Sequence, residues 1–84
     1  MKGERRIEPT IRGTIFPVEW DKNDNVVQVV IDIPDQEGYL IDQNKKGKEL
    51  LEFIRHEVEI SGSIREDEDG NLIFNVKEYS LIKG

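Results

Sequence analysis

The stretch Glu57-Val58-Glu59-Ile60-Ser61-Gly62-Ser63-Ile64-Arg65 alternates residue by residue between two kinds of side chain. One parity holds charged residues and serines, and the other holds only apolar residues and one glycine. A period of two with one apolar side is the pattern of a β-strand with one face in the core and one in water. This stretch therefore predicts a strand whose buried positions are Val58, Ile60, Gly62 and Ile64.

The same period occurs in the first half of the chain. The segment Val26 to Ile33 alternates strictly and is ended by Pro34-Asp35. Its apolar parity predicts four core residues, which are Val27, Val29, Ile31 and Ile33. A turn over Gln36-Glu37-Gly38 follows, and Tyr39 to Asp42 is then a short third strand.

Two longer segments alternate but change parity once. Thr10 to Asp21 slips at Pro17, and Leu72 to Ile82 slips near Glu78. A single slip of this kind indicates a β-bulge, which bends the strand and changes the parity that faces the core. With Gly13 in its first half, the earlier segment predicts a long, bent strand at a barrel corner.

One segment has a helical period. Between Asn44 and Glu57, four apolar residues gather on one side of a helix and charged residues surround them. The apolar residues are Leu50, Leu51, Phe53 and Ile54. A helix this short is marginal alone in water, so we expect its apolar side to pack on the sheet and plug one end of it.

Composition supports a chain made mostly of strands. The 84 residues contain 11 Ile and 7 Val but only 5 Leu and no Ala. Helical domains draw on Ala and Leu, whereas β-branched side chains suit pleated surfaces. A chain of this length forms one domain. We expect residues 1–9 to be a flexible tail and residues 10–84 to be the domain.

The predicted order is strand, strand, strand, helix, strand, strand. With the segments Lys48-Glu49-Leu50-Leu51, Val58 to Ile64 and Asp69 to Val76, this order resembles the OB-fold, which is a five-stranded Greek-key barrel. The sequence is similar to small bacterial OB-fold families, namely the tRNA-anticodon-binding-like group and the OB-fold proteins of the cell envelope. The resemblance implies an all-β barrel with one helix between strands 3 and 4.

Charge limits the kinds of partner. Twelve Lys and Arg against 18 Asp and Glu give a net charge of −6. Binding to nucleic acid begins with a basic surface, so this balance disfavours it.

The N-terminus has no apolar run of a signal peptide, and no segment approaches the ~20 apolar residues of a membrane span. We expect no membrane contact and a cytoplasmic protein, or a soluble domain of a larger one.

No arrangement of residues predicts catalysis. His56 is the only histidine, and we interpret it as a cation near a helix C-terminus. Ser61 and Ser63 lie on the polar parity of their strand, without the glycine-rich loop of a serine hydrolase. The acidic pairs Glu57/Glu59 and Asp67/Asp69 lie on exposed elements, whereas a catalytic pair of carboxylates needs removal from water. We therefore expect a protein that is not an enzyme and that uses no cofactor.

Metal binding is also not predicted. Asp21-x-Asn23-x-Asn25 fits the first three ligand positions of an EF-hand, but the sixth position is Val26 instead of glycine. The chain has no cysteine, which excludes thiolate zinc sites. The acidic segment Glu66 to Asn71 is read as a hairpin loop, and a weak cation site there is left open.

The remaining expectation is a binding surface. OB-fold proteins usually hold ligands on the outer face of strands 2 and 3 and in the loops between strands 1 and 2 and strands 4 and 5. We expect a non-catalytic module that recognises a protein, a basic ligand or a cation there; the alternative is single-stranded nucleic-acid binding on the same face. We also expect a monomer or a weak homodimer. The candidate binding residues are Trp20, Lys22, Gln28, Val30, Tyr39, Asp67 and Asp69.

Overall fold

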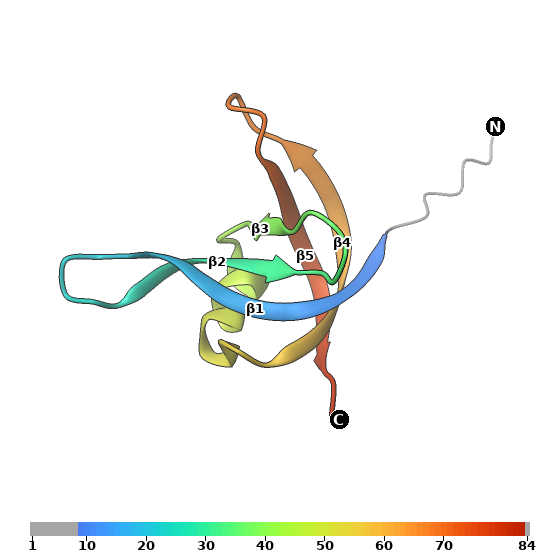
Figure 1. The fold of residues 1–84 in the computed structure, drawn as a ribbon, viewed down its shortest axis with the longest axis horizontal. Helices are drawn as coiled ribbons and strands as arrows, with labels where there is room; N and C mark the ends of the chain where they lie inside the picture. Colours follow the sequence, from blue (N-terminus) through green and yellow to red (C-terminus); the bar gives the residue numbers. More distant parts are fainter. Residues whose placement is uncertain (1–8, 84) are drawn as a thin grey trace.

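Five strands and one short helical segment follow one another in residues 9–83, the part of the chain that this computed structural model describes (Figure 1). Of the expected tail over residues 1–9, residues 1–8 lie outside the described residues, and Pro9 O accepts a hydrogen bond from Gly62 N (3.2 Å). The elements are β1 (Thr10–Trp20), β2 (Val26–Asp32), β3 (Tyr39–Ile41), α1 (Lys45–Glu49), the 3₁₀ helix η1 (Leu50–Phe53), β4 (Glu57–Glu66) and β5 (Leu72–Leu81).

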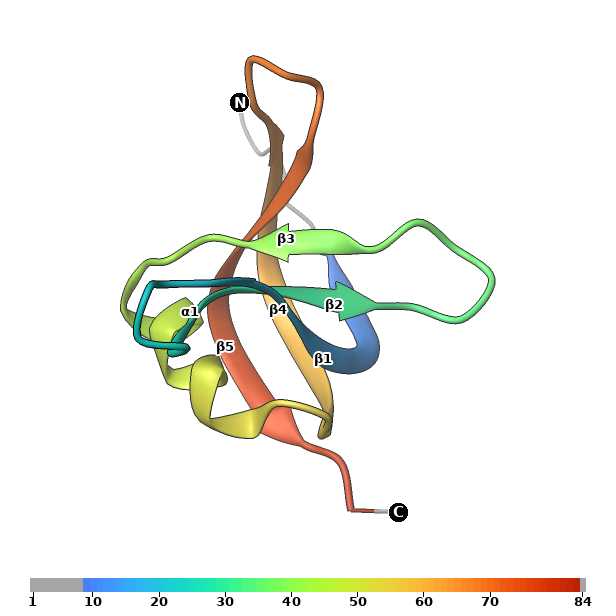
Figure 2. The same ribbon diagram turned by 60° about the vertical axis from the view of Figure 1, so that its left-hand side comes forward.

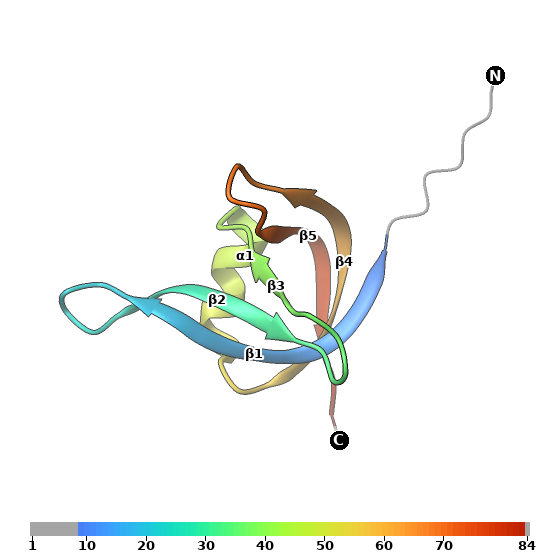
Figure 3. The same cartoon turned by 45° about the horizontal axis from the view of Figure 1, so that its top comes forward.

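The strands close into a barrel in the order β1-β2-β3-β5-β4, with β4 returning to pair with β1. All neighbours are antiparallel except β3 and β5, which run parallel. The helical segment lies between β3 and β4 and covers one end of the barrel (Figures 1 and 3). The all-β barrel of OB type that the sequence predicted is confirmed.

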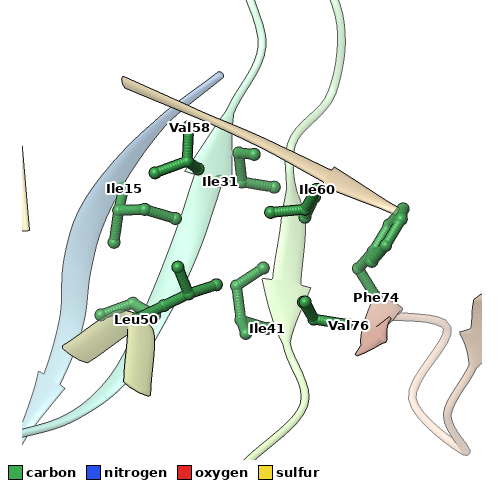
Figure 4. Close-up of a cluster of buried hydrophobic side chains, with 9 residues drawn as sticks. Ile15, Ile31, Ile41, Leu50, Val58, Ile60, Phe74 and Val76 are labelled. Atoms are coloured by element: carbon green, nitrogen blue, oxygen red, sulfur yellow. The ribbon is translucent and has the colours of Figure 1, made fainter. Parts of the chain in front are cut away.

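The core is filled by β-branched residues from all five strands, together with Leu50 from η1 and Phe74 (Figure 4). None of these side chains is more than 1% exposed. The full set is Ile15, Val29, Ile31, Ile41, Leu50, Val58, Ile60, Phe74 and Val76. Leu51, Phe53 and Ile54 pack against this cluster and are partly buried. The helical segment therefore plugs the barrel, as its apolar side predicted.

The bulge predicted at Pro17 is present, and a second bulge that was not predicted corrects one core assignment. Pairing between β1 and β2 slips twice, which leaves Val18 and Val27 without partners in the ladder. Each extra residue reverses the parity that follows it. As a result Val27, predicted to lie in the core, is 38% exposed, whereas its neighbour Val26 packs against the core.

The parity change predicted near Glu78 is also present. Pairing of β4 with β5 slips between Ser61 and Gly62, and Lys77 is the extra residue. Ile64 was predicted to be buried and is instead 39% exposed. Its side chain keeps the inward parity. The pairing of β4 with β1 stops at Ser61, opposite Thr10, the first residue of β1, so no residue of β1 lies beside Ile64.

The helix is shorter than the predicted segment Asn44 to Glu57. Its start is as expected, because the side chain of Asn44 accepts a hydrogen bond from Gly47 N (2.8 Å) and caps it. Its end comes early because β1 uses the next residues to continue the barrel. Ile15 N donates to His56 O (3.1 Å), and Arg55 N donates to Ile15 O (2.6 Å). Arg55 has a positive φ of 70°, which no helix accommodates.

Gly13 stands at a barrel corner, as the sequence predicted. A Cβ atom added there would overlap the carbonyl oxygen of Asp32 on the neighbouring strand. Only glycine permits this close approach of β1 to β2. Within residues 9–83, the helical segments are all too short and too polar to span a membrane.

Candidate binding face

A stripe of apolar side chains crosses the outside of the barrel. Phe16 on β1 pairs with Val30 on β2, which pairs with Leu40 on β3, which pairs with Ile73 on β5. Their chain neighbours Ile15, Ile31, Ile41 and Phe74 are buried, so alternation points the four side chains outward. Each is only half-buried. We call Phe16, Val30, Leu40 and Ile73 the outer stripe.

A hollow of about 290 Å³ lies beside this stripe, and residues of the β2–β3 loop and of the β4–β5 loop contribute to its lining. Its apolar lining comes from Val30, Leu40 and Leu72. Glu37 and Asn71 are the polar residues in its wall. The hollow therefore has an apolar lining and lies next to the acidic loop of residues 66–71.

Two arginines border the outer stripe, and both are engaged within the chain. Arg65 Nη2 lies 2.8 Å from Asp42 Oδ1, in an ion pair that joins β4 to the end of β3. The guanidinium of Arg55 lies over the ring of Phe16, 5.8 Å from its centroid. These partners reduce the capacity of either arginine to bind phosphate, because their charges are already compensated or stacked.

Five of the seven predicted binding residues separate into two groups. Val30 lines the hollow, and Asp67 and Asp69 lie in the loop beside it. Trp20, 52% exposed, and Lys22 lie at the far end of the β1–β2 hairpin, which projects away from the β4–β5 loop (Figures 1 and 2). The structure therefore does not bring all the candidates together in one site.

Tyr39 and Gln28 have roles within the fold. The ring of Tyr39 packs edge-on against Phe74, with centroids 5.9 Å apart, and is partly buried against the core. The Gln28 side-chain amide donates to Val29 O (2.9 Å) and to Ile41 O (2.8 Å). Gln28 thus closes the end of the ladder between β2 and β3.

Sequence reasoning missed several residues of this face. Phe16, Leu40, Leu72, Glu37 and Asn71 join it because of strand register and the path of two loops. The parity of Phe16 and Leu40 was a usable signal, since each follows or precedes a core position. No signal in the sequence indicated that Glu37 and Asn71 line the same hollow, because their loops are more than 30 residues apart in the sequence.

The two acidic hairpin loops share one hydrogen-bonding pattern. Asp21 Oδ1 accepts from Asn23 N and Asn25 N at 2.8 and 3.0 Å. Asp67 Oδ1 accepts in the same way from Asp69 N and Asn71 N, at 2.9 and 2.8 Å. The backbone hydrogen bonds from Asn25 and Asn71 are the main cause of a lowered pKa at Asp21 and Asp67 respectively.

These bonds engage the carboxylates of Asp21 and Asp67 within their own loops. Asp24, Glu68 and Asp69 are exposed, as Asp21 is too. Over residues 9–83, the acidic and histidine side chains form no group of three or more that could hold a metal ion. The His56 ring packs edge-on against Phe53, with centroids 6.1 Å apart. His56 lies beyond the end of η1, three residues after Phe53.

Comparison with known proteins adds no family to this description. No protein-family model matches the chain, and no curated protein sequence matches it.

Proposed function

We propose that this protein is a non-catalytic binding module that holds an aliphatic side chain of a partner protein in the hollow beside the outer stripe. The observation that carries the proposal is the apolar lining from Val30, Leu40 and Leu72 at the foot of an acidic loop. Its volume of about 290 Å³ is at the small end of ligand pockets, which run from ~300 to 1,000 Å³. A single side chain suits it better than a cofactor.

Charge defines the rest of the partner. Glu37 is in the wall of the hollow, and Glu68 and Asp69 are exposed in the loop beside it. A basic residue next to the aliphatic one would meet these carboxylates, and complementary charge favours encounter and register. The partner is therefore a polypeptide segment with a leucine-like residue flanked by lysine or arginine.

The hollow offers little for catalysis. Glu37 is the one titratable side chain among the residues that line it, and it is exposed. General acid–base catalysis needs a group whose pKa is tuned by burial or by a close partner. Binding without reaction is the function that this lining supports.

An NMR titration with the acetylated, amidated peptide Lys-Leu-Lys tests the proposal. We expect shifts of the Val30, Leu40, Asn71 and Leu72 amides, and loss of those shifts in Val30→Asp. Leu81→Asp is the matched control, because Leu81 is an exposed apolar residue (41%) outside the hollow. Equal binding by both variants would contradict the proposal.

Single-stranded nucleic-acid binding is the second candidate. The exposed indole of Trp20 favours it, because exposed aromatic rings stack on bases in OB-fold proteins. The same titration with a short oligonucleotide would show it by shifts around Trp20 instead of Leu72.

A further inference from the structure

Strand β4 continues beyond the strand that pairs with one of its sides. The last pair between β1 and β4 is Thr10 with Ser61, and Gly62 N donates one more bond to Pro9 O (3.2 Å). β4 then runs on to Glu66, paired with β5 along its other side. Figure 1 shows this upper part of β4 rising past the start of β1. Among residues 9–83, no strand pairs with this side of β4 after Gly62.

The backbone groups on the open side can be identified by alternation. Gly62 N points toward β1, so the N–H and C=O of Ile64 and Glu66 point the same way. The pairing with β5 gives the same direction for Ile64. Its partner Phe74 directs its carbonyl away from β4, where it accepts a hydrogen bond from Asp42 N (2.9 Å). Ile64 and Glu66 thus present hydrogen-bonding groups that β5 does not use.

Two other strand edges in the described residues are blocked. On β1, the backbone N–H and C=O of Ile15 bond to His56 and Arg55. The backbone of Pro17, two residues later, faces the same side of the strand, and proline has no N–H that could pair there. On β2, the Gln28 amide occupies the carbonyls of Val29 and Ile41. Devices of this kind prevent unwanted strand pairing. Within the part of the chain that the structure describes, the β4 edge has no proline and no capping amide, and it carries an isoleucine that is 39% exposed.

We propose that the edge of β4 at Ile64 and Glu66 accepts an added antiparallel strand from a basic partner polypeptide. The inference is separate from the hollow, which β4 does not line. The partner's strand would exchange both backbone hydrogen bonds with Ile64, in the manner of β-augmentation.

Charge and parity define the partner's sequence. An aliphatic residue opposite Ile64 would cover the exposed side chain. In an antiparallel strand, the residue two positions earlier stands opposite Glu66, and a basic side chain there pairs with the carboxylate. Glu68 and Asp69 follow in the loop, so a second basic residue suits the partner position two residues before the one opposite Glu66. The partner motif is basic-x-basic-x-aliphatic.

The probe is the acetylated, amidated peptide Lys-Thr-Arg-Thr-Ile, added to the full chain during amide hydrogen exchange by NMR. We expect exchange at Ile64 and Glu66 to slow by about tenfold at saturation, with no change at Val30 or Leu40. The peptide Glu-Thr-Glu-Thr-Ile is the charge control and should have no effect. Glu66→Lys should reverse this preference and bind the acidic peptide.

Ile64→Pro supplies the second test. It removes the N–H that points to the open edge and leaves the bonds between β4 and β5 in place, whereas Ile64→Val keeps both. Binding should disappear in the first variant and persist in the second. If Ile64→Pro does not fold, the charge reversal at Glu66 still decides.

Three results would overturn the proposal. The first is strong protection of the Ile64 and Glu66 amides in the free chain, which would mean that the chain fills its own edge. The second is protection that rises with protein concentration alone, which would make a second copy the occupant. The third is no change at either amide with millimolar basic peptide.

Discussion

The side chains of Asp67 and Asn71 close the β4–β5 loop together. Asp67 Oδ1 accepts from Asn71 N at 2.8 Å, and Asp67 Oδ2 accepts from Asn71 Nδ2 at 3.1 Å. Asp67 N also donates to Asn71 O at 2.9 Å. Asp21 and Asn25 repeat the arrangement in the β1–β2 loop. The loop turns because Asp and Asn side chains bond to nearby backbone groups.

This relationship predicts a stability that falls in acid. Folding lowers the pKa of Asp67 below its ordinary value of 3.8, mainly through the hydrogen bond from Asn71 N. The charged carboxylate therefore stabilises the folded state above about pH 4, and this contribution is lost as the pH falls through the lower, folded-state pKa. Asp67→Asn should flatten the change of melting temperature with pH over that range.

Asp69→Asn is the matched control for this prediction. It removes the same charge from the same loop, but no hydrogen bond holds the Asp69 carboxylate in the described structure. If Asp69→Asn and Asp67→Asn flatten the curve equally, general charge repulsion and not the loop bond causes the acid sensitivity.

A second prediction concerns the residue that turns each loop. Asp24 and Gly70 occupy equivalent positions with φ of 65° and 84°. A side chain in this left-handed region costs ~1–2 kcal/mol, partly offset by the lower chain entropy of a non-glycine residue. Asp24→Gly should raise the free energy of unfolding in urea by about 0.5 kcal/mol, and Gly70→Ala should lower it by about 1 kcal/mol. Asn23→Gly, with no positive φ to relieve, should give no gain.

Strand periodicity was enough to predict the strands, because burial on one face imposes a period of two. The barrel was expected from the order of the elements, through its resemblance to the OB-fold. Periodicity failed where barrel geometry overrides alternation. Val27 is exposed because it is the extra residue of a second bulge in the pairing of β1 with β2, and Ile64 is exposed because the pairing of β1 with β4 stops before it. The helix ended early because Arg55 and His56 bond to β1. None of these facts belongs to the local sequence.

The binding face was less predictable than the fold. The outward direction of Val30 could be predicted, because the parity of a strand is visible in the sequence. The bond from the Gln28 amide to Ile41 O could not be predicted, since it depends on where β3 stops. Glu37 and Asn71 meet only in three dimensions, where two loops approach each other. Prediction of the candidate binding face therefore needed the register in which the strands pair, which composition and residue spacing do not contain.

A third prediction tests the helical plug. Leu50 is fully buried in the core cluster, and Ile54 packs against this cluster. Truncation of a core leucine costs ~2–5 kcal/mol, comparable to the whole stability of a small domain. Leu50→Ala with Ile54→Ala should give a largely unfolded chain at ~25 °C, seen as collapse of the NMR dispersion. Leu81→Ala, at an exposed position, should stay folded.

The last prediction sets the order of the two candidate functions. Non-specific nucleic-acid binding draws nearly all its free energy from Lys and Arg that displace counterions, and reaches ~10⁻⁴–10⁻⁶ M at physiological salt. Here the net charge is −6, and Arg55 and Arg65 are engaged by Phe16 and Asp42. Stacking on Trp20 returns about 1–3 kcal/mol, and Tyr39 adds little because it packs on Phe74. We expect a Kd weaker than about 10⁻⁴ M for short single strands at ~0.15 M salt, measured by fluorescence anisotropy. Micromolar binding that Trp20→Ala abolishes would reverse the order and make nucleic acid the first candidate ligand.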